Sequence, residues 1–342
     1  MRPTTFSLGA RQVGEGQACV IVARVASAHE GSAETAQRMI EAAFTMGADA
    51  IQFQIFRSDL LVVRRHPGRR NLDAVELSAK EWRGVLKAAK ASGLAVLAEA
   101  LDHASLELAA EAGVDAHQVH TTDMENPEFI RAVGSLGRPV LLTVGAVPEG
   151  VVREACDLVG GPLGLLHGLP TVPAPLEELR FRDLLAMKES YRVPVGFLDQ
   201  TDGGSAFALL APALAAAHGA DLVVKPFTLD RTRKGPDYQP SLSPEDFYRM
   251  VELLRQAERA RGDGAAAESE GARRLRRQMA RSIVAGGLIP RGEVLTAPML
   301  AFKRTDARFE PGFPPREAHR VIGRRAARPI QADETIREDM LE

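Results

Sequence analysis

Residues 195–242 read VGFLDQTDGGSAFALLAPALAAAHGADLVVKPFTLDRTRKGPDYQPSL, and this stretch decides the fold. It contains two short apolar runs, 195–198 and 222–224, with an Ala/Leu-rich helical segment between them. Polar or unusual residues follow directly, at 199–201 after the first run and at 225–226 after the second. In a (β/α)₈ barrel the strands end at one common face, where the site is built. The stretch therefore predicts a strand–helix–strand unit with candidate site residues at its strand ends.

The same alternation extends over most of the chain. Strands are expected at 18–25, 50–55, 95–99, 116–120, 139–144, 163–167, 195–198 and 222–224, and helices at 33–46, 79–92, 104–112, 127–135, 150–159, 176–189, 205–218 and 244–260. Eight strand–helix units of this size predict an α/β fold, a (β/α)₈ TIM barrel. The alternative is an open doubly wound sheet, but no glycine-rich phosphate loop follows the first strand to favour it.

The chain has 342 residues, of which 45% are hydrophobic and 26% are charged. This composition is typical of a globular protein. The net charge of −2 speaks against a general nucleic-acid binder. No apolar run approaches the roughly 18 residues of a membrane span, and no secretory signal pattern opens the chain. Cys19 and Cys156 lack motif spacing, which is typical of buried thiols in a reducing compartment. We therefore expect a cytoplasmic protein with no membrane and no nucleic-acid partner.

The sequence also predicts a second, smaller domain. The barrel is expected over 1–260, a small-residue linker (RGDGAAAESEGA) over 261–272, and a module over 273–342 with short strands at 282–284, 293–295, 321–322 and 330. From Arg273 onward 15 Lys/Arg stand against 9 Asp/Glu, a net charge of +6, while the remaining 28 against 36 give −8. The basic module could dock on an acidic surface such as a partner subunit, or simply expose a solvated face.

Six segments in both domains carry a family resemblance. They are ARVASAHEGS (23–32), GADAIQFQ (47–54), LLHGLPTVPAP (165–175), VGFLDQT (195–201), KPFTLDRTRKGPD (225–237) and RSIVAGGLIPRGE (281–293). Through them the chain resembles the sialic acid (N-acetylneuraminate) synthase family, a barrel followed by a C-terminal antifreeze-like SAF domain of β-clip type. The resemblance implies condensation of phosphoenolpyruvate with an N-acyl hexosamine, a divalent metal such as manganese, and a homodimer with the SAF domain swapped onto the partner barrel.

The site residues depart from the family pattern. Gln200 and Pro226 stand where the family has its two metal-binding histidines, and neither is a good ligand for such a metal. Gln52 and Gln118 replace two lysines of the phosphate pocket, and Glu99 replaces a threonine hydroxyl. Arg24 replaces a glutamate at the end of the first strand. We therefore expect a degenerate site with no metal and no cofactor.

The candidate site residues include these changed positions and others that match the family or change mildly. The candidates for catalysis are Arg24, His29, Glu30, Glu99 and Asp123, and those for binding a substrate are Gln52, Gln54, Gln118, Thr121, Thr143, Asp199, Gln200, Asp237 and Arg304. The resemblance places Asp237 and Arg304 among the family's sugar contacts, and it supplies Arg304 from the partner subunit. We expect the sugar half of the pocket to survive better than the phosphate half.

Simpler interpretations accompany these candidates. Arg24 and Glu99 could form an internal ion pair that only fills the barrel mouth. His29 could satisfy a loop carbonyl, and Asp199 could accept backbone N–H bonds from its own loop. His103, His120 and His167 could rebuild a metal site with Glu99, but histidines near a barrel mouth are more often ordinary hydrogen-bonding residues. The arginines at 64, 65, 69 and 70 predict a solvated loop, with anion binding as the alternative.

Three functions from different classes remain open at this point. The first is a non-catalytic sugar-binding or regulatory relative of the synthases, alone or paired with an active synthase paralogue. The second is an enzyme with remodelled, metal-independent aldol, lyase or isomerase chemistry on a sugar-like substrate. The third is an active phosphoenolpyruvate-dependent N-acylneuraminate synthase.

Overall fold

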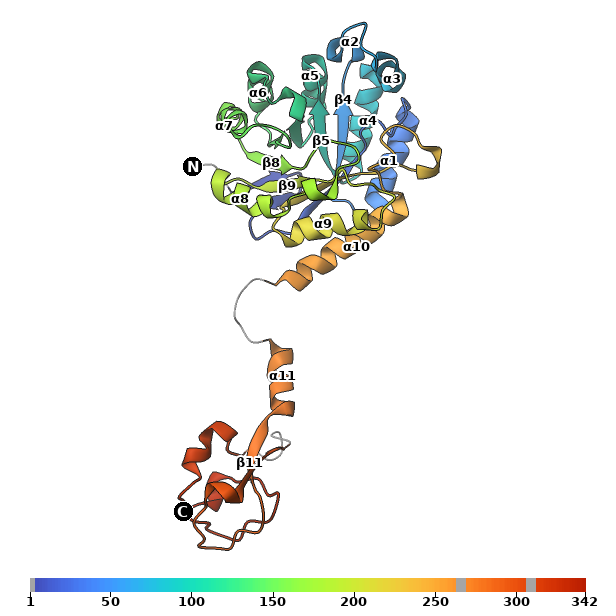
Figure 1. Ribbon diagram of the computed structural model, residues 1–342. Coiled ribbons are helices and arrows are strands. Elements are labelled where there is room, and N and C mark those ends of the chain that lie inside the picture. The colour runs from blue at the N-terminus through green and yellow to red at the C-terminus, as the bar shows by residue number, and fades with distance from the viewer. Residues whose placement is uncertain (1–3, 263–268, 306–311) are drawn as a thin grey trace. The chain divides into compact units, whose positions relative to one another are not determined.

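The computed structural model describes residues 4–262, 269–305 and 312–342. The chain divides into two compact units, Met1–Gly262 and Asp263–Glu342. In the first unit, parallel strands form a closed barrel (Figure 1). In order around the barrel these strands are β3 (Val20–Arg24), β4 (Ala50–Ile55), β5 (Ala95–Ala100), β6 (Ala116–Val119), β7 (Val140–Thr143), β8 (Leu163–His167), β9 (Val195–Leu198) and β10 (Leu222–Pro226). Because β10 pairs with β3, the barrel is confirmed and the doubly wound sheet is excluded.

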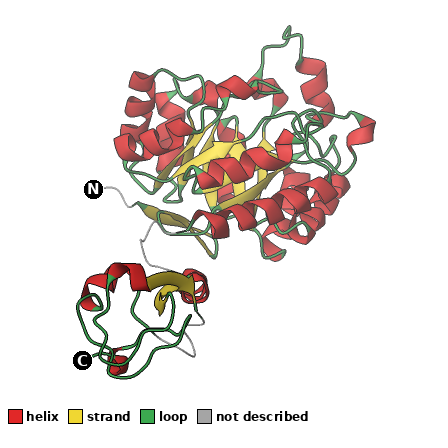
Figure 2. Cartoon of the chain, turned by 60° about the horizontal axis from the view of Figure 1, so that its bottom comes forward, coloured by secondary structure: helices red, strands yellow, loops and turns green. Residues whose placement is uncertain are grey.

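Helices surround this barrel on the outside (Figure 2). They are α1 (Ala33–Thr45), α4 (Ala79–Ala91), α5 (His103–Glu111), α6 (Pro127–Gly134), α7 (Glu149–Leu158), α8 (Arg182–Tyr191), α9 (Phe207–Ala217) and α10 (Pro244–Arg261). Capping side chains begin two of these helices: the Ser32 side chain accepts from Thr35 N, and Ser78 and Glu81 make a reciprocal capping box. Across the described ranges, no helix combines the length and apolarity needed to cross a bilayer.

The period of two along each strand sorts side chains between the barrel interior and the helix layer. In β5, Ala95 and Leu97 belong to the interior cluster, whereas Val96 and Ala98 pack with the helices. The apolar interior is completed by a hairpin, β1 (Thr5–Leu8) and β2 (Arg11–Gly14), which packs against residues near the strand N-termini. This hairpin was not expected, because so short a pair gives little periodic signal.

Two connections differ from expectation. The helix predicted at 176–189 is wrong: a 3₁₀ turn (Leu176–Glu178) and α8 are separate, since Arg180 adopts a left-handed φ of 44° between them. The Arg-rich loop after β4 contains two short helices, α2 (Ser58–Leu61) and α3 (Arg69–Val75). Within it, Arg69 binds Asp73 at 2.7 Å and the Ser58 carbonyl at 3.0 Å, so this arginine braces the loop.

The second unit has its own small core. Helix α11 (Glu270–Met279) leads into β11 (Arg281–Ala285), which pairs antiparallel with β12 (Leu300–Arg304), and isolated bridges join Ile289 to Ile330. The strand expected at 321–322 is wrong, because these residues form a turn after a 3₁₀ segment. Residues 263–268 of the expected linker lie outside the described residues, and the rest of it already includes the start of α11.

Candidate active site

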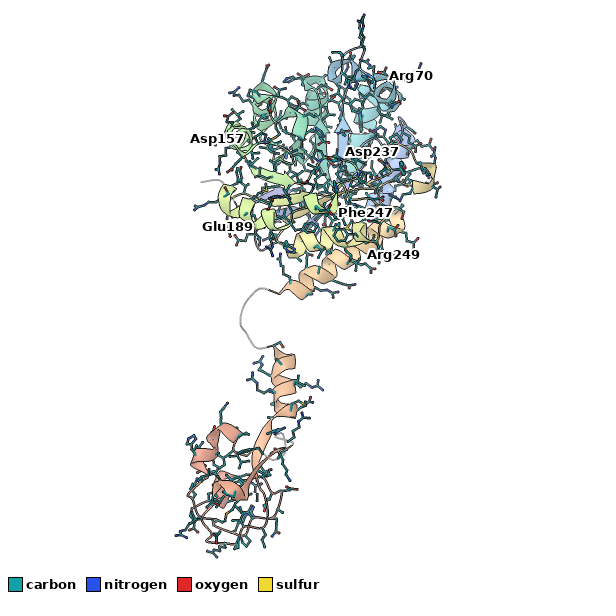
Figure 3. All side chains as sticks on the ribbon, in the orientation of Figure 1. Arg70, Asp157, Glu189, Asp237, Phe247 and Arg249 are labelled. Carbon is teal, nitrogen blue, oxygen red and sulfur yellow. The ribbon has the colours of Figure 1, made fainter. Side chains whose placement is uncertain are left out.

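Polar side chains gather inside the barrel at the C-terminal ends of the strands. The alternation that turns Ala95 and Leu97 inward also turns Glu99 inward, and on β4 it does the same for Gln52 and Gln54. A cavity of about 180 Å³ opens above them, here called the mouth cavity, and its lining includes Arg24, Gln54, His120, Gln200, Pro226 and Asp237. Asp237, labelled in Figure 3, lies in the segment that follows β10. This end of a barrel is where catalytic side chains are found.

Glu99 is the centre of the polar layer below the mouth cavity and is fully buried. Its Oε2 accepts from Arg24 Nη2 at 2.9 Å and from Gln54 Nε2 at 2.9 Å. Its Oε1 accepts from Gln118 Nε2 at 2.8 Å. A buried carboxylate is stable only with a counter-charge and hydrogen-bond donors, and Glu99 has both. The ion pair of Arg24 and Glu99 considered from the sequence is therefore present.

The layer continues around the barrel from Gln118. Gln52 Nε2 donates to Gln118 Oε1 at 2.8 Å, and Gln118 Nε2 lies 3.0 Å from Thr143 Oγ1. Six of the residues singled out from the sequence thus form one hydrogen-bonded group, the Glu99 network: Arg24, Gln52, Gln54, Glu99, Gln118 and Thr143. These side chains bond to one another where the resemblance implies groups that hold a phosphate, although Arg24 Nη1 and Gln52 Oε1 have no hydrogen-bond partner among the described residues.

A second buried cluster lies at the ends of β9 and β10. Lys225 Nζ is 2.9 Å from Asp199 Oδ2, and both side chains are fully buried. Lys225 also donates to Thr201 Oγ1 at 3.1 Å, and Asp199 Oδ1 accepts from Thr201 N at 2.8 Å. Burial lowers the pKa of Lys225, and the charge of Asp199 opposes that shift. Asp199 therefore contacts protein groups, and it does not line the mouth cavity.

Sequence reasoning did not select Lys225 as a site residue. The sequence did contain a signal for it: an ionisable residue stands inside the apolar run LVVKPF, and a buried charge requires a partner. On β10 the side chain of Val224 faces the barrel interior. The next residue, Lys225, therefore points its side chain to the outer face of the barrel wall. This position makes Lys225 a brace for the Asp199–Thr201 turn.

The AHEG loop after β3 packs beside the Asp237 loop. Ser27 N donates to Asp237 Oδ2 at 2.9 Å, and Glu30 forms an ion pair with Arg233 at 3.0 Å. His29 is buried, accepts from Gly31 N through Nδ1 at 3.2 Å, and meets Trp82 edge-on. Burial lowers the pKa of His29 to about 4, against the opposing charge of Asp237. His29 is therefore a neutral hydrogen-bond acceptor of its own loop at physiological pH.

Thr121 and Asp123 follow β6 in a short 3₁₀ turn. Thr121 Oγ1 donates to the Thr143 carbonyl at 3.3 Å, which ties this turn to β7. Burial raises the pKa of the Asp123 carboxyl, while a bond from Thr122 opposes the rise and the charge of Glu99 adds to it. Asp123 is therefore a partly buried carboxyl group that feels the Glu99 charge.

The three histidines considered for a relocated metal site each contact a different residue. His103 meets the Phe129 ring edge-on, His120 Nδ1 lies 2.9 Å from Thr122 Oγ1, and His167 Nε2 lies 3.1 Å from the Leu179 carbonyl. Among the residues that the structure describes, no group of three or more His, Cys, Asp or Glu side chains is placed to hold a metal ion. The relocated metal site is thus not assembled from these residues.

The positions of the family's metal ligands do not fit a divalent ion either. Pro226 has no donor atom in its side chain, and its register partner Arg24 offers only hydrogen-bond donors. Gln200 Oε1 is buried without a hydrogen-bond partner, but a single amide oxygen is a weak ligand for a first-row metal. The side chains at the mouth cavity therefore do not provide a ligand set that suits the divalent metal implied by the resemblance.

Two further groups of candidates belong to other segments of the chain. Arg304 ends β12 of the second unit, where it is exposed and pairs in register with Arg281. Arg64, Arg65 and Arg70 are exposed on the loop that follows β4, which agrees with a solvated face.

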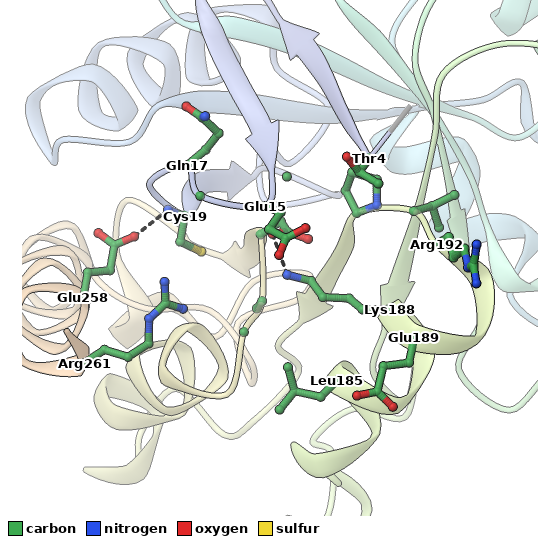
Figure 4. Close-up of a pocket in the computed structure, with 17 residues that line it drawn as sticks. Thr4, Glu15, Gln17, Cys19, Leu185, Lys188, Glu189, Arg192, Glu258 and Arg261 are labelled. Atoms are coloured by element: carbon green, nitrogen blue, oxygen red, sulfur yellow. Dashed lines mark hydrogen bonds and ion pairs between the residues drawn. The ribbon is translucent and has the colours of Figure 1, made fainter. Parts of the chain in front are cut away.

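A larger cavity of about 400 Å³ lies at the other end of the barrel (Figure 4). Its lining includes Cys19, Pro194 and Asp221, which directly precede β3, β9 and β10, and Lys188 pairs with Asp221 there at 2.7 Å. Residues at the N-terminal face of a barrel serve mainly stability. The smaller mouth cavity is therefore the candidate active site.

Comparison with known proteins gives consistent matches. The model of the NeuB family matches residues 39–266, and that of the SAF domain matches residues 280–342. An uncharacterized protein of Methanocaldococcus jannaschii is 29% identical, with 87% of this chain and 88% of that protein covered. The N,N'-diacetyllegionaminic acid synthase of Legionella pneumophila is 26% identical over 96% of both chains. The crystal structure of an N-acetylneuraminic acid synthetase from Leptospira borgpetersenii superposes with a TM-score of 0.74 at 23% identity, covering 79% of this chain and 94% of that one, which shows the fold.

Proposed function

This chain belongs to the NeuB family, and on that premise we propose that it is a synthase-like protein of carbohydrate biosynthesis that binds a sugar but does not condense it with phosphoenolpyruvate. The observation that carries the proposal is the Glu99 network. It fills the strand ends with hydrogen-bonded neutral amides and one ion pair.

The network disfavours a phosphate in two ways. Each lysine replaced by Gln52 or Gln118 removes a charge-assisted hydrogen bond worth about 1.5–3 kcal/mol. Arg24 does not replace the lost lysines, because its charge is already compensated by Glu99 at 2.9 Å. Together these changes cost several kcal/mol, or roughly a thousandfold in affinity for phosphoenolpyruvate.

The absence of a suitable donor set for a divalent metal supports the same proposal. In the family reaction the metal would polarise the sugar aldehyde. Pro226 has no ligand atom in its side chain, and Gln200 offers only a weak amide ligand. We therefore propose that the protein works without a divalent metal.

The sugar side of the mouth retains polar groups that a carbohydrate could use. Asp237 and Gln54 both line the cavity, with Asp237 oriented by Ser27 N and Gln54 by Glu99. Carboxylate and amide groups fixed in this way are suited to hydroxyl groups of a sugar. This half of the site supports binding of a sugar-like small molecule.

A product assay tests the proposal directly. Wild-type protein is incubated with phosphoenolpyruvate, Mn²⁺ and N-acetylmannosamine, and nine-carbon acid is detected by mass spectrometry, with an active N-acetylneuraminate synthase run in parallel. We expect no product from this protein and, by calorimetry, no saturable binding of phosphoenolpyruvate. Product formation at the rate of the active enzyme would overturn the proposal.

A second candidate function is metal-independent isomerase or lyase chemistry on a carbonyl sugar. The observation that favours it is Asp123, whose raised pKa brings a carboxyl group nearer to the range useful for proton transfer. Proton exchange at a sugar carbon would incorporate deuterium from D₂O, which NMR detects. An unchanged sugar spectrum after long incubation would exclude this second function.

A further inference from the structure

The connection between β4 and α4 exposes a run of apolar side chains. Residues 60–63 read LLVV, in which Val63 is 74% exposed, Leu60 is 53% exposed and the two residues between them are partly exposed. None of the four is part of the hydrophobic clusters that the described residues form. Single exposed apolar side chains are ordinary, whereas a consecutive run of them indicates a contact surface.

Arginines follow this run at the corners of a turn. His66 N donates to the Val63 carbonyl at 2.9 Å, which closes a turn with Arg64 and Arg65 at its two central positions. Arg70, labelled in Figure 3, is exposed a few residues later. These three arginines form no ion pair with another described residue. Residues 60–70, here called the tip, therefore combine exposed apolar surface with positive charge that is not compensated.

No acidic residue stands within the tip to offset this charge. The nearest carboxylates along the chain are bound to arginines of the same connection. Asp59 pairs with Arg57 at 2.9 Å, and Asp73 pairs with Arg69 at 2.7 Å. The positive charge at the turn is therefore available to a partner.

The position of the tip favours a surface over a small ligand. Helices α2 and α3, which the tip joins, lie at the outer edge of the barrel unit (Figure 1). A projecting segment of this kind does not enclose a small molecule, which needs a concave site. Arginine binds phosphate oxygens through paired N–H donors, and apolar side chains gain free energy on entering hydrocarbon. A bilayer with anionic phospholipid offers both kinds of contact.

We propose that the tip is a peripheral docking surface for anionic phospholipid. Leu60 and Val63 enter the bilayer interface, and Arg64 and Arg65 bind lipid phosphates. The expectation of no membrane partner depends on the lack of a spanning segment, and a peripheral contact needs none. Residues 1–272 carry 28 Lys/Arg against 36 Asp/Glu, a net charge of −8, so the barrel unit as a whole is not drawn to an anionic surface. Docking through the tip would bring the barrel mouth near the bilayer, because the tip follows the C-terminal end of β4.

Vesicle co-sedimentation with the chain of 342 residues tests the proposal. One set of vesicles contains phosphatidylcholine alone, and the other contains phosphatidylcholine and phosphatidylglycerol in equal parts. We expect binding to the anionic set only, and weaker binding as the salt concentration rises, because salt screens exposed charges. Equal binding to both sets would overturn the proposal. So would the absence of binding to the anionic set, which would leave an acidic protein as the partner that fits the tip.

Variants of the tip assign the contacts. Arg64→Ser/Arg65→Ser removes two cations, each worth roughly fivefold in binding to an anionic surface, so we expect at least a tenfold loss. Arg64→Lys/Arg65→Lys keeps the charge and should retain most of the binding. Leu60→Ser/Val63→Ser changes no charge, and we expect at least a fivefold loss because less apolar surface leaves water. Binding equal to that of the wild type in both serine variants would overturn the proposal.

Matched controls lie elsewhere on the chain. Arg274→Ser/Arg277→Ser removes the same charge from the exposed face of α11 in the basic second unit, and Phe44→Ser removes a side chain that is 61% exposed on α1. Both should bind anionic vesicles nearly as the wild type does. A loss in the α11 variant as large as that of the arginine variant of the tip would assign the contact to the second unit and overturn the proposal. The assay contains no sugar and no phosphoenolpyruvate, so its outcome is independent of the proposed function.

Discussion

Arg24 Nη2 lies 2.9 Å from Glu99 Oε2 at the C-terminal ends of β3 and β5, with β4 between them. Each residue supplies the counter-charge that the other needs. Because both side chains are buried, the loss of either one would leave an uncompensated charge inside the barrel. The two residues therefore act as one unit of the fold.

Glu99→Gln should destabilise the fold. It leaves the Arg24 guanidinium buried without a counter-charge, and breaking a buried pair in this way costs about 3–5 kcal/mol. Urea denaturation followed by circular dichroism measures the change. The double variant Arg24→Met/Glu99→Leu removes both charges and should recover most of the loss. The exposed pair Arg83–Glu111 provides the control, and Glu111→Gln there should have a much smaller effect. A Glu99→Gln midpoint equal to that of the wild type would contradict the account of the network.

Lys225→Met should be destabilising for a related reason. It leaves Asp199 fully buried and removes its 2.9 Å partner, at a cost of about 3–5 kcal/mol. Adding Asp199→Asn should recover part of this loss, since the amide needs no counter-charge. A double-mutant cycle from urea denaturation gives the coupling. Strictly additive effects of the two substitutions would show that the pair does not act as a unit.

Stability should fall as the pH drops below about 6.5. Burial lowers the pKa of both His29 and His117 to about 4, so between pH 6.5 and 4 the unfolded chain binds protons that the folded chain does not. Each residue then costs up to about 3 kcal/mol by pH 4. Urea denaturation at pH 7 and pH 5 measures the slope. A free energy of unfolding that does not change over this range would contradict the prediction.

His117→Leu should reduce that slope and also stabilise the protein at pH 7. Both ring nitrogens of His117 are buried without a hydrogen-bond partner among the described residues. Removing an unsatisfied buried polar group yields about 1 kcal/mol when the replacement packs comparably. His66→Leu on the exposed loop is the control, because His66 is solvated. A lower melting temperature for His117→Leu at both pH values would show that the ring is needed for packing.

Removal of divalent metal should leave the protein unchanged. Because Gln200 and Pro226 supply no adequate donor set, we expect the same melting temperature and the same affinity for N-acetylmannosamine with and without EDTA. Differential scanning fluorimetry and calorimetry on the same sample measure both quantities. A drop in melting temperature on chelation that Mn²⁺ reverses would reveal a metal site.

The protein should form a homodimer, as the resemblance implies. Sedimentation equilibrium should then give about twice the chain mass of 36.9 kDa. The prediction concerns the chain of 342 residues, in which the basic module from Arg273 onward carries a net charge of +6. A mass equal to that of one chain across the accessible concentration range would contradict it.

Much of the fold follows from local patterns. Apolar runs such as the one at Val195–Leu198, and caps such as Ser78 with Glu81, locate the barrel strands and most helices near their observed bounds. The hairpin Thr5–Gly14 was missed because its strands are short and gain their stability only by packing against the barrel floor. The interruption at Arg180 was missed because a single left-handed residue leaves the helical periodicity intact.

For the candidate site, the sequence by itself determined which side chains face the barrel interior. The alternation in QFQ places Gln52 and Gln54 on the side of the strand that faces inward, and the same parity applies to Glu99. Only the tertiary structure decided their partners. Arg24 and Glu99 are 75 positions apart, and they meet because barrel closure and strand register bring the ends of β3, β4 and β5 to one level. Side-chain direction is a property of two adjacent residues, whereas a contact depends on the register of every strand between them.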